Sequence, residues 1–224
     1  MQLTISLSTL LLTLPGLTSA HMMLDHPSVW GRKSQGSNLE TPLNRKSGKN
    51  WPHHGAKKDT SEVLELKAGQ DEKLPIVCGE ALGKPNPAKV CKAKSDIHMG
   101  GGCALSIAYK NVGKPSKDDF IVISVNHNCP QLGPFTHSFP MPENLPECEA
   151  CTCAWTWVPD ERSSADEMYM NTFNCKVTGG KKGKIQGGKK PIYFGVEGGV
   201  EGGKGGRPKY KTKFKNGAQK LKVQ

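Results

Sequence analysis

The sequence lacks an apolar run long enough to cross a lipid bilayer, which takes about 20 residues. Its most apolar stretch, Leu10–Leu14, is much too short. The C-terminal end lacks the hydrophobic segment that directs attachment of a lipid anchor. Because no Asn-x-Ser/Thr sequence occurs, we expect no N-linked glycan. These absences predict a protein with neither a membrane span nor a lipid anchor.

Charged residues are missing from the first 20 positions, where a short apolar core is followed by small residues at Thr18 and Ala20. This pattern is typical of a secretory signal peptide, so we expect residues 1–20 to be removed and the protein to be secreted and extracellular. Cleavage after Ala20 would leave His21 at the amino terminus. Its α-amine and imidazole, together with one further imidazole, would form a T-shaped set of nitrogens that suits copper. The alternative is that His21 is incidental to cleavage.

Most of the chain lacks an excess of either charge. Residues 21–178 contain 18 basic and 18 acidic residues, whereas residues 179–224 contain 12 lysines, one arginine and two glutamates. The net charge of +11 therefore lies in the C-terminal segment, where Gly-Gly-Lys repeats without an apolar period predict a disordered basic tail. Its role is either weak adhesion to acidic wall polymers or none. A nucleic-acid partner is not expected of an exported chain without interleaved aromatic and basic residues.

Eight cysteines all lie between positions 78 and 175. In an exported protein they predict up to four disulfide bonds. A zinc site at Cys148, Cys151 and Cys153 is the alternative, which an oxidising compartment disfavours.

Alternating or β-branched residues predict strands at 103–109, 120–126, 151–158 and 167–177. Frequent turns separate them, and the sequence shows no amphipathic helix and no internal repeat. Residues 21–178 are therefore expected to form one all-β domain, an antiparallel β-sandwich. The polar segment 31–74 predicts long loops laid over its core.

Two features could carry chemistry. His98 directly precedes a predicted strand and is followed by three glycines, which let the backbone turn sharply and project a ligand from a loop. Glu167, Tyr169 and Asn171 alternate along the last predicted strand and share one face. If that face meets the imidazoles of His21 and His98, Tyr169 could occupy a distant axial position, and Glu167 could steer dioxygen or peroxide. The alternatives are a solvated loop histidine and an ordinary strand tyrosine.

Six segments, in their order along the chain, resemble fungal lytic polysaccharide monooxygenases and most of all the chitin-active group, auxiliary-activity family eleven. They are His21–Pro27, Cys78–Gly79, His98–Cys103, Asn128–Pro130, Ala154–Trp157 and Glu167–Asn171. The resemblance implies an immunoglobulin-like β-sandwich with a surface copper held by His21 and His98. It further implies that Tyr169 is axial and that Glu167 is an acid beside the open coordination position.

The resemblance also implies two disulfide bonds, Cys103–Cys129 and Cys78–Cys175. It leaves open the pairing of the other four cysteines, which are Cys91, Cys148, Cys151 and Cys153.

The function that the resemblance implies is oxidative cleavage of a β-1,4-linked polysaccharide by a monomer with one copper per chain. The expected substrate is chitin, with cellulose as the second choice, and the reaction needs an external reductant and O2 or H2O2. One alternative is a copper-handling protein of the same fold, in which Asp25 or the 31–74 loop blocks polysaccharide. The other is a non-catalytic protein that binds carbohydrate or the cell wall.

Overall fold

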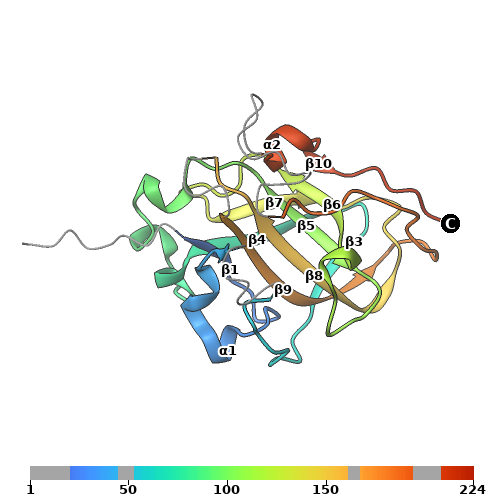
Figure 1. The fold of residues 1–224 in the computed structure, drawn as a ribbon, viewed down its shortest axis with the longest axis horizontal. Coiled ribbons are helices and arrows are strands. Elements are labelled where there is room, and N and C mark those ends of the chain that lie inside the picture. Colours follow the sequence, from blue (N-terminus) through green and yellow to red (C-terminus); the bar gives the residue numbers. More distant parts are fainter. Residues whose placement is uncertain (1–20, 45–52, 161–166, 194–207) are drawn as a thin grey trace, which may run out of the picture.

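Two β-sheets form the protein in the computed structural model, which describes residues 21–44, 53–160, 167–193 and 208–224 (Figure 1). The smaller sheet contains, in spatial order, β1 (Met22–Leu24), β4 (Asp71–Cys78) and β7 (Thr136–Pro140). The larger sheet contains, in spatial order, β10 (Gly217–Ala218), β6 (Ile121–Asn126), β5 (Cys103–Ala108), β8 (Cys148–Trp157), β9 (Glu167–Thr178) and β2 (Leu43–Asn44). A further strand, β3 (Leu64–Lys67), runs parallel to β9, and all other pairings are antiparallel.

Helices are short. The α-helices are α1 (Arg32–Gln35) and α2 (Tyr210–Lys213), and the 3-10 helices are η1 (Gly36–Glu40), η2 (Gly79–Ala81), η3 (Pro87–Lys89), η4 (Lys94–Ile97) and η5 (Lys117–Asp119). None of these described helices has the length and apolarity needed to span a membrane.

The four strands predicted from alternation are confirmed as β5, β6, β8 and β9, and so is the β-sandwich. The expectation of loops alone over 31–74 is wrong, because β2, β3 and the start of β4 lie in this segment. These strands are short or largely polar, so their sequences carry little alternation. They are held by pairing with β9 and β7 rather than by their own pattern.

Strand β5 is buried on both faces, which explains how the layers are built. Leu105 and Ile107 point into the core between the two sheets, where they join Trp155 and Phe139. On the other face of β5, Ala104 and Ala108 belong to a second apolar cluster on the outer face of the large sheet, and Ser106 between them is also buried. That outer face therefore needs a cover.

The C-terminal segments provide this cover. Ile192, Tyr193, Tyr210 and Phe214 are buried in the second cluster, and β10 extends the sheet beside β6. The predicted disordered tail is therefore wrong for residues 179–193 and 208–224, while residues 194–207 lie outside the described part. The burial of a few aromatic and aliphatic side chains stabilises this segment in one conformation, although its average composition is that of a flexible chain.

All eight cysteines form disulfide bonds, so the zinc alternative is wrong. The pairs are Cys78–Cys91, Cys103–Cys129, Cys148–Cys151 and Cys153–Cys175. The second pair is the one that the resemblance implies, whereas the implied Cys78–Cys175 bond is wrong. Cys78 ends β4 in the small sheet, and Cys175 lies on β9 next to β8, which carries Cys153. Only sulfurs whose Cβ atoms lie about 4 Å apart can bond.

Candidate metal centre

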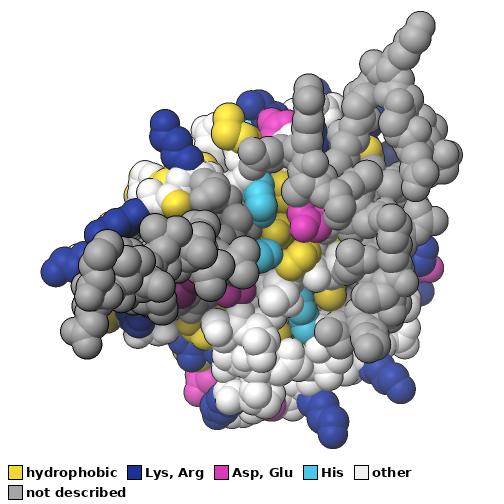
Figure 2. All heavy atoms as spheres, turned by 60° about the vertical axis from the view of Figure 1, so that its left-hand side comes forward, with side chains coloured by type: hydrophobic (Ala, Val, Ile, Leu, Met, Phe, Trp, Pro, Cys, Tyr) yellow, Lys and Arg dark blue, Asp and Glu magenta, His cyan; other side chains and the backbone are white. Residues whose placement is uncertain are grey.

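Two histidines and a tyrosine from distant parts of the chain meet at one place. His21 directly precedes β1, His98 follows η4, and Tyr169 lies near the start of β9. The ring centroids of His21 and His98 are 6.2 Å apart with their planes at 80°. The hydroxyl oxygen of Tyr169 lies 3.2 Å from Nε2 of His98. The structure thus brings together the three residues that the sequence nominated, and Figure 2 shows histidine side chains near the middle of one face.

The glycine loop, residues 98–102, presents His98. All five residues have positive φ, from 38° at His98 to 115° at Gly101. A Cβ atom on Gly101 would lie 2.3 Å from the carbonyl oxygen of Val158, so only glycine fits there. The loop is tied to the next segment by a hydrogen bond from the Asp160 N–H to the Gly100 carbonyl, at 3.1 Å. Backbone geometry therefore sets the direction of His98.

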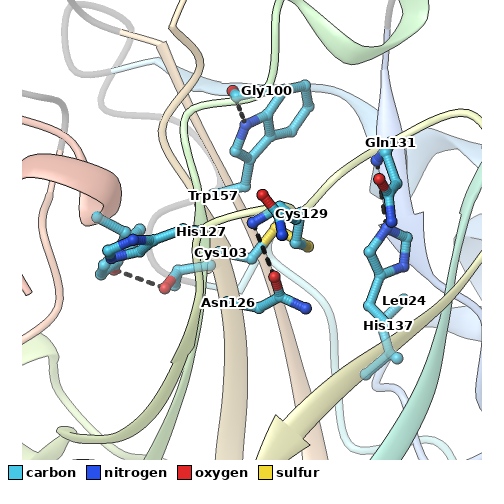
Figure 3. The surroundings of a disulfide bond; sticks show 12 residues. Leu24, Gly100, Cys103, Asn126, His127, Cys129, Gln131, His137 and Trp157 are labelled. Atoms are coloured by element: carbon cyan, nitrogen blue, oxygen red, sulfur yellow. Dashed lines mark hydrogen bonds between the residues drawn. A yellow bond between two sulfur atoms is a disulfide. The ribbon is translucent and has the colours of Figure 1, made fainter. Parts of the chain in front are cut away.

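Trp157 contacts both the glycine loop and Tyr169. The sequence analysis did not identify it as a residue of the site. Its indole N–H donates to the Gly100 carbonyl at 2.7 Å (Figure 3). Its ring stacks on Tyr169 with centroids 4.4 Å apart and lies 5.8 Å from the ring of His98. The alternation of residues 151–158 places Trp157 on an inward face, but nothing in the local pattern identifies its partners.

Asn171 links β9 to the strand that begins at His21. Its side-chain oxygen accepts the backbone N–H of Leu24 at 2.8 Å, and its side-chain nitrogen donates to the carbonyl of Leu39 at 3.0 Å. Tyr169 and Asn171 share one face of β9, as predicted, so the same face holds both the tyrosine and the strand behind His21.

Carboxylates surround His21. Glu167 begins β9, and Glu80 lies in η2, which follows the β4 residue paired with Met22. Burial lowers the pKa of His21 below its ordinary value, and repulsion from His98 lowers this pKa further. Glu167 and Glu80 act in the opposite direction on the pKa of His21. A neutral imidazole is the form that binds a metal. Sequence reasoning missed Glu80, because only the register of β1 against β4 brings it close.

Asp25, the residue that could have blocked polysaccharide, is engaged elsewhere. One of its carboxylate oxygens accepts from the Arg32 guanidinium at 2.8 Å, and the other accepts the Gly83 N–H at 2.8 Å. Asp25 therefore ties α1 to the segment after η2.

The donor set fits a metal held between two imidazoles. Two rings that bind one ion from opposite sides, with metal–nitrogen distances of about 2.0–2.1 Å, would have centroids about 6 Å apart, close to the 6.2 Å observed. Within the described ranges no group of three or more His, Cys, Asp or Glu side chains could hold a metal ion. Any metal here therefore needs donors of another kind, and the α-amine of a terminal His21 and the hydroxyl of Tyr169 are such groups.

A β-sandwich that brings two histidines and a tyrosine together in this way has the architecture of a lytic polysaccharide monooxygenase. The model of the family "Lytic polysaccharide monooxygenase AA14" matches residues 2–191, most of the chain, and the chain belongs to this family. Assignment to family eleven is therefore wrong. The segments on which the resemblance rested include His21, His98 and Tyr169, the residues that meet at this site.

Curated relatives agree with this placement. The chain is 31% identical over 198 residues to AA14 family lytic polysaccharide monooxygenase B of Pycnoporus cinnabarinus, covering 73% of this chain and 51% of that protein. It is 30% identical over 192 residues to monooxygenase A of the same family from Trametes coccinea, covering 69% of this chain and 44% of that protein. The chain thus spans about half the length of the curated relatives it matches.

Among solved structures, the extended catalytic domain of H. jecorina LPMO9A superimposes with a TM-score of 0.51 at 12% identity. The match covers 81% of this chain and 78% of that domain, and it supports the fold alone.

Proposed function

We propose that the protein is a secreted, copper-dependent monooxygenase that oxidatively cleaves a β-1,4-linked polysaccharide. The observation that carries this proposal is the convergence of His21, His98 and Tyr169, with the tyrosine hydroxyl 3.2 Å from His98 Nε2. Membership of the AA14 family supports the same class of reaction.

Each residue of the site has a role in this proposal. His21 and His98 hold one copper ion through their imidazoles, and removal of residues 1–20 gives a third nitrogen, the His21 α-amine. The hydroxyl of Tyr169, which faces Nε2 of His98, would offer a further oxygen donor beside the two imidazoles. Bound copper supplies the redox chemistry, the oxidation of a sugar C–H bond at C1 or C4 with an external reductant and O2 or H2O2. Glu167 lies beside this site and holds or delivers a proton.

Which polysaccharide the protein cleaves can be tested directly. The expectation of chitin rested on the resemblance to family eleven, and membership of the AA14 family removes that support. Chitin, cellulose and xylan are all β-1,4-linked and together sample chains with and without the acetamido and hydroxymethyl groups.

The test is copper binding followed by product analysis. The protein is secreted with residues 1–20 present, its amino terminus is determined by mass spectrometry, and electron paramagnetic resonance is recorded after copper loading. We expect His21 at the terminus and an axial signal with nitrogen couplings. We also expect oxidised oligosaccharides from one of the three polymers in the presence of ascorbate.

Variants separate the site from the rest of the protein. His98→Ala should lower copper affinity by orders of magnitude, while His26→Ala removes an imidazole that bonds to Ser28 and should leave affinity unchanged. The same signal without products from any polymer would favour the copper-handling alternative. A different amino terminus and no tight copper site would leave a non-catalytic wall or carbohydrate-binding protein.

A further inference from the structure

An open groove of about 450 Å³ lies directly beside His98. The side chains that matter for its chemistry are Lys94, Met99, Asn128, Gln131, Leu132 and Lys211. They come from η4, the glycine loop, the turn after β6, and α2, so four separate segments build the groove.

The groove combines an apolar surface with positive charge. Met99, the residue after His98, is 68% exposed, although most large apolar side chains in the described part are buried. Leu132 adds further apolar area, and Asn128 and Gln131 offer amide groups. Such a surface can pack against the C–H faces of sugar rings and hydrogen-bond their hydroxyls.

The charge of the groove has one sign. Lys94 and Lys211 are exposed, and among the described residues no aspartate or glutamate lines the groove with them. Neither lysine forms an ion pair within the described residues. A concave surface with two uncompensated ammonium groups favours an anion.

The groove is held rigidly against the metal centre. The backbone N–H of Lys211 donates to the Gly101 carbonyl at 3.1 Å, and the Gly102 N–H donates to the Cys129 carbonyl at 3.0 Å. Tyr210, next to Lys211, is fully buried, with its hydroxyl 2.6 Å from that of Thr156. A ligand in the groove would therefore lie at a fixed position relative to His98.

We propose that this groove binds a carboxylate-bearing stretch of an acidic polysaccharide, a chain with uronic-acid groups, and so directs a neighbouring sugar to His98. The inference rests on the proposed function, because a groove beside the metal centre can direct a sugar to it only if the protein acts on a polysaccharide. The lysines recognise the carboxylates, and the apolar surface around Met99 recognises the sugar rings.

The test compares two polymers that differ only in charge: glucuronoxylan, and the same glucuronoxylan after chemical reduction of its carboxyl groups. Binding is measured by affinity electrophoresis without reductant, so that no turnover occurs. We expect the double variant Lys94→Gln/Lys211→Gln to bind glucuronoxylan about fivefold more weakly, as fits two exposed charge interactions. Its binding to the reduced polymer should be unchanged, and salt at about 0.5 M should abolish the difference between the polymers.

The matched control lies in a second basic groove, lined by Lys189, Lys215 and Lys220 near β10. Lys215→Gln/Lys220→Gln removes the same charge and should leave glucuronoxylan binding unchanged. An equal loss in both double variants, or equal binding of the two polymers by the unmodified protein, would overturn the inference.

Product analysis keeps the two proposals apart. Oxidised products from any of the polymers, together with glucuronoxylan binding that does not depend on Lys94 or Lys211, would leave the proposed function standing and reject the groove. Lysine-dependent binding without oxidised products from any polymer would support the groove as a binding site for acidic glycans and reject the proposed function.

Discussion

The hydroxyl of Tyr169 lies 3.2 Å from Nε2 of His98, although the two residues are 71 positions apart in the chain. This contact joins β9 of the large sheet to the glycine loop and identifies the nitrogen of His98 that faces the site. Three further relationships, through Trp157, Gly101 and Tyr210, show how the protein holds that geometry.

Tyr169→Phe removes the hydroxyl and keeps the ring stacked on Trp157. Copper affinity should stay within a few-fold of the unmodified protein, because two imidazoles remain, while the electron paramagnetic resonance spectrum and the turnover should change. Tyr109→Phe is the matched control, since its hydroxyl donates to Pro146 and not to the site. An unchanged spectrum for Tyr169→Phe would return this tyrosine to an ordinary strand role.

Trp157→Phe should weaken copper binding through the loop that carries His98. The substitution removes the indole N–H that donates to Gly100, and the loss of such a part-buried bond costs about 1 kcal/mol. Trp155→Phe is the control, because Trp155 is equally buried on the same strand and its indole nitrogen has no hydrogen-bond partner among the described residues. Isothermal titration with copper should separate the two variants, and equal affinities would contradict the supporting role of Trp157.

Gly101→Ala should disrupt the glycine loop. At φ 115° an L-residue is strained, and its Cβ would lie 2.3 Å from the Val158 carbonyl oxygen. Gly113→Ala has a similar φ of 91° with no atom within 4 Å of the added Cβ, so it measures strain without the clash. Urea unfolding should show a larger loss for Gly101→Ala, by more than about 1 kcal/mol, together with weaker copper binding. Similar losses in both variants would mean that the loop relaxes around the methyl group.

Stability should fall between pH 6.5 and pH 4. Burial lowers the pKa of both His54 and His137 to about 4, from the ordinary value of 6.5. As the pH falls through this range, the unfolded chain takes up protons on these histidines before the folded protein does. The two histidines therefore contribute fully to the free energy of unfolding above pH 6.5, and this contribution is lost as the pH approaches 4.

The measurement is urea unfolding at pH 7.5 and pH 5.0. Between pH 7.5 and pH 5.0, the contribution of each histidine to the free energy of unfolding should decrease by about 2 kcal/mol. His54→Gln should lower the pH dependence by this amount, since the carboxylates titrate alike in both proteins. Identical pH dependence in the two proteins would show that folding does not lower the pKa of His54.

Tyr210→Phe should destabilise the domain, although Tyr210 lies in a segment rich in glycine and lysine. Its hydroxyl lies 2.6 Å from the Thr156 hydroxyl and accepts the N–H of Ile192, so both partners lose a buried bond, at a cost of about 1–3 kcal/mol. Lys220→Ala, at an exposed position in the same segment, should change the unfolding free energy by less than about 0.5 kcal/mol. Equal unfolding free energies for Tyr210→Phe and the unmodified protein would mean that the hydroxyl bonds of Tyr210 do not stabilise the domain.

The strands that could be predicted are those with alternating or β-branched sequences, and most of their residues are buried. β5, β6, β8 and β9 are strands of this kind, whereas β1 has three residues, β2 has two, and β3 and β4 contain charged residues. Pairing with a neighbour makes these segments strands, and a neighbour cannot be read from a local window of sequence.

The same limit applies to the site. Residue types and spacing nominate His21, His98 and Tyr169, because each chemical role needs a particular side chain at a strand start or in a glycine-rich loop. Glu80 and Trp157 have ordinary local contexts. They reach the site only through the register of β1 against β4 and through the fold of the glycine loop.

The sequence by itself predicted the class of fold and up to four disulfide bonds, since these follow from composition and local periodicity, and the resemblance nominated His21 and His98, whose rings the structure brings together. Only the tertiary structure decided that Cys78 bonds to Cys91 rather than to Cys175, and that residues 208–214 cover the large sheet and support the glycine loop. The physical reason is the same in each case. Contacts between distant residues depend on strand order, register and close packing, and these are properties of the assembled sandwich.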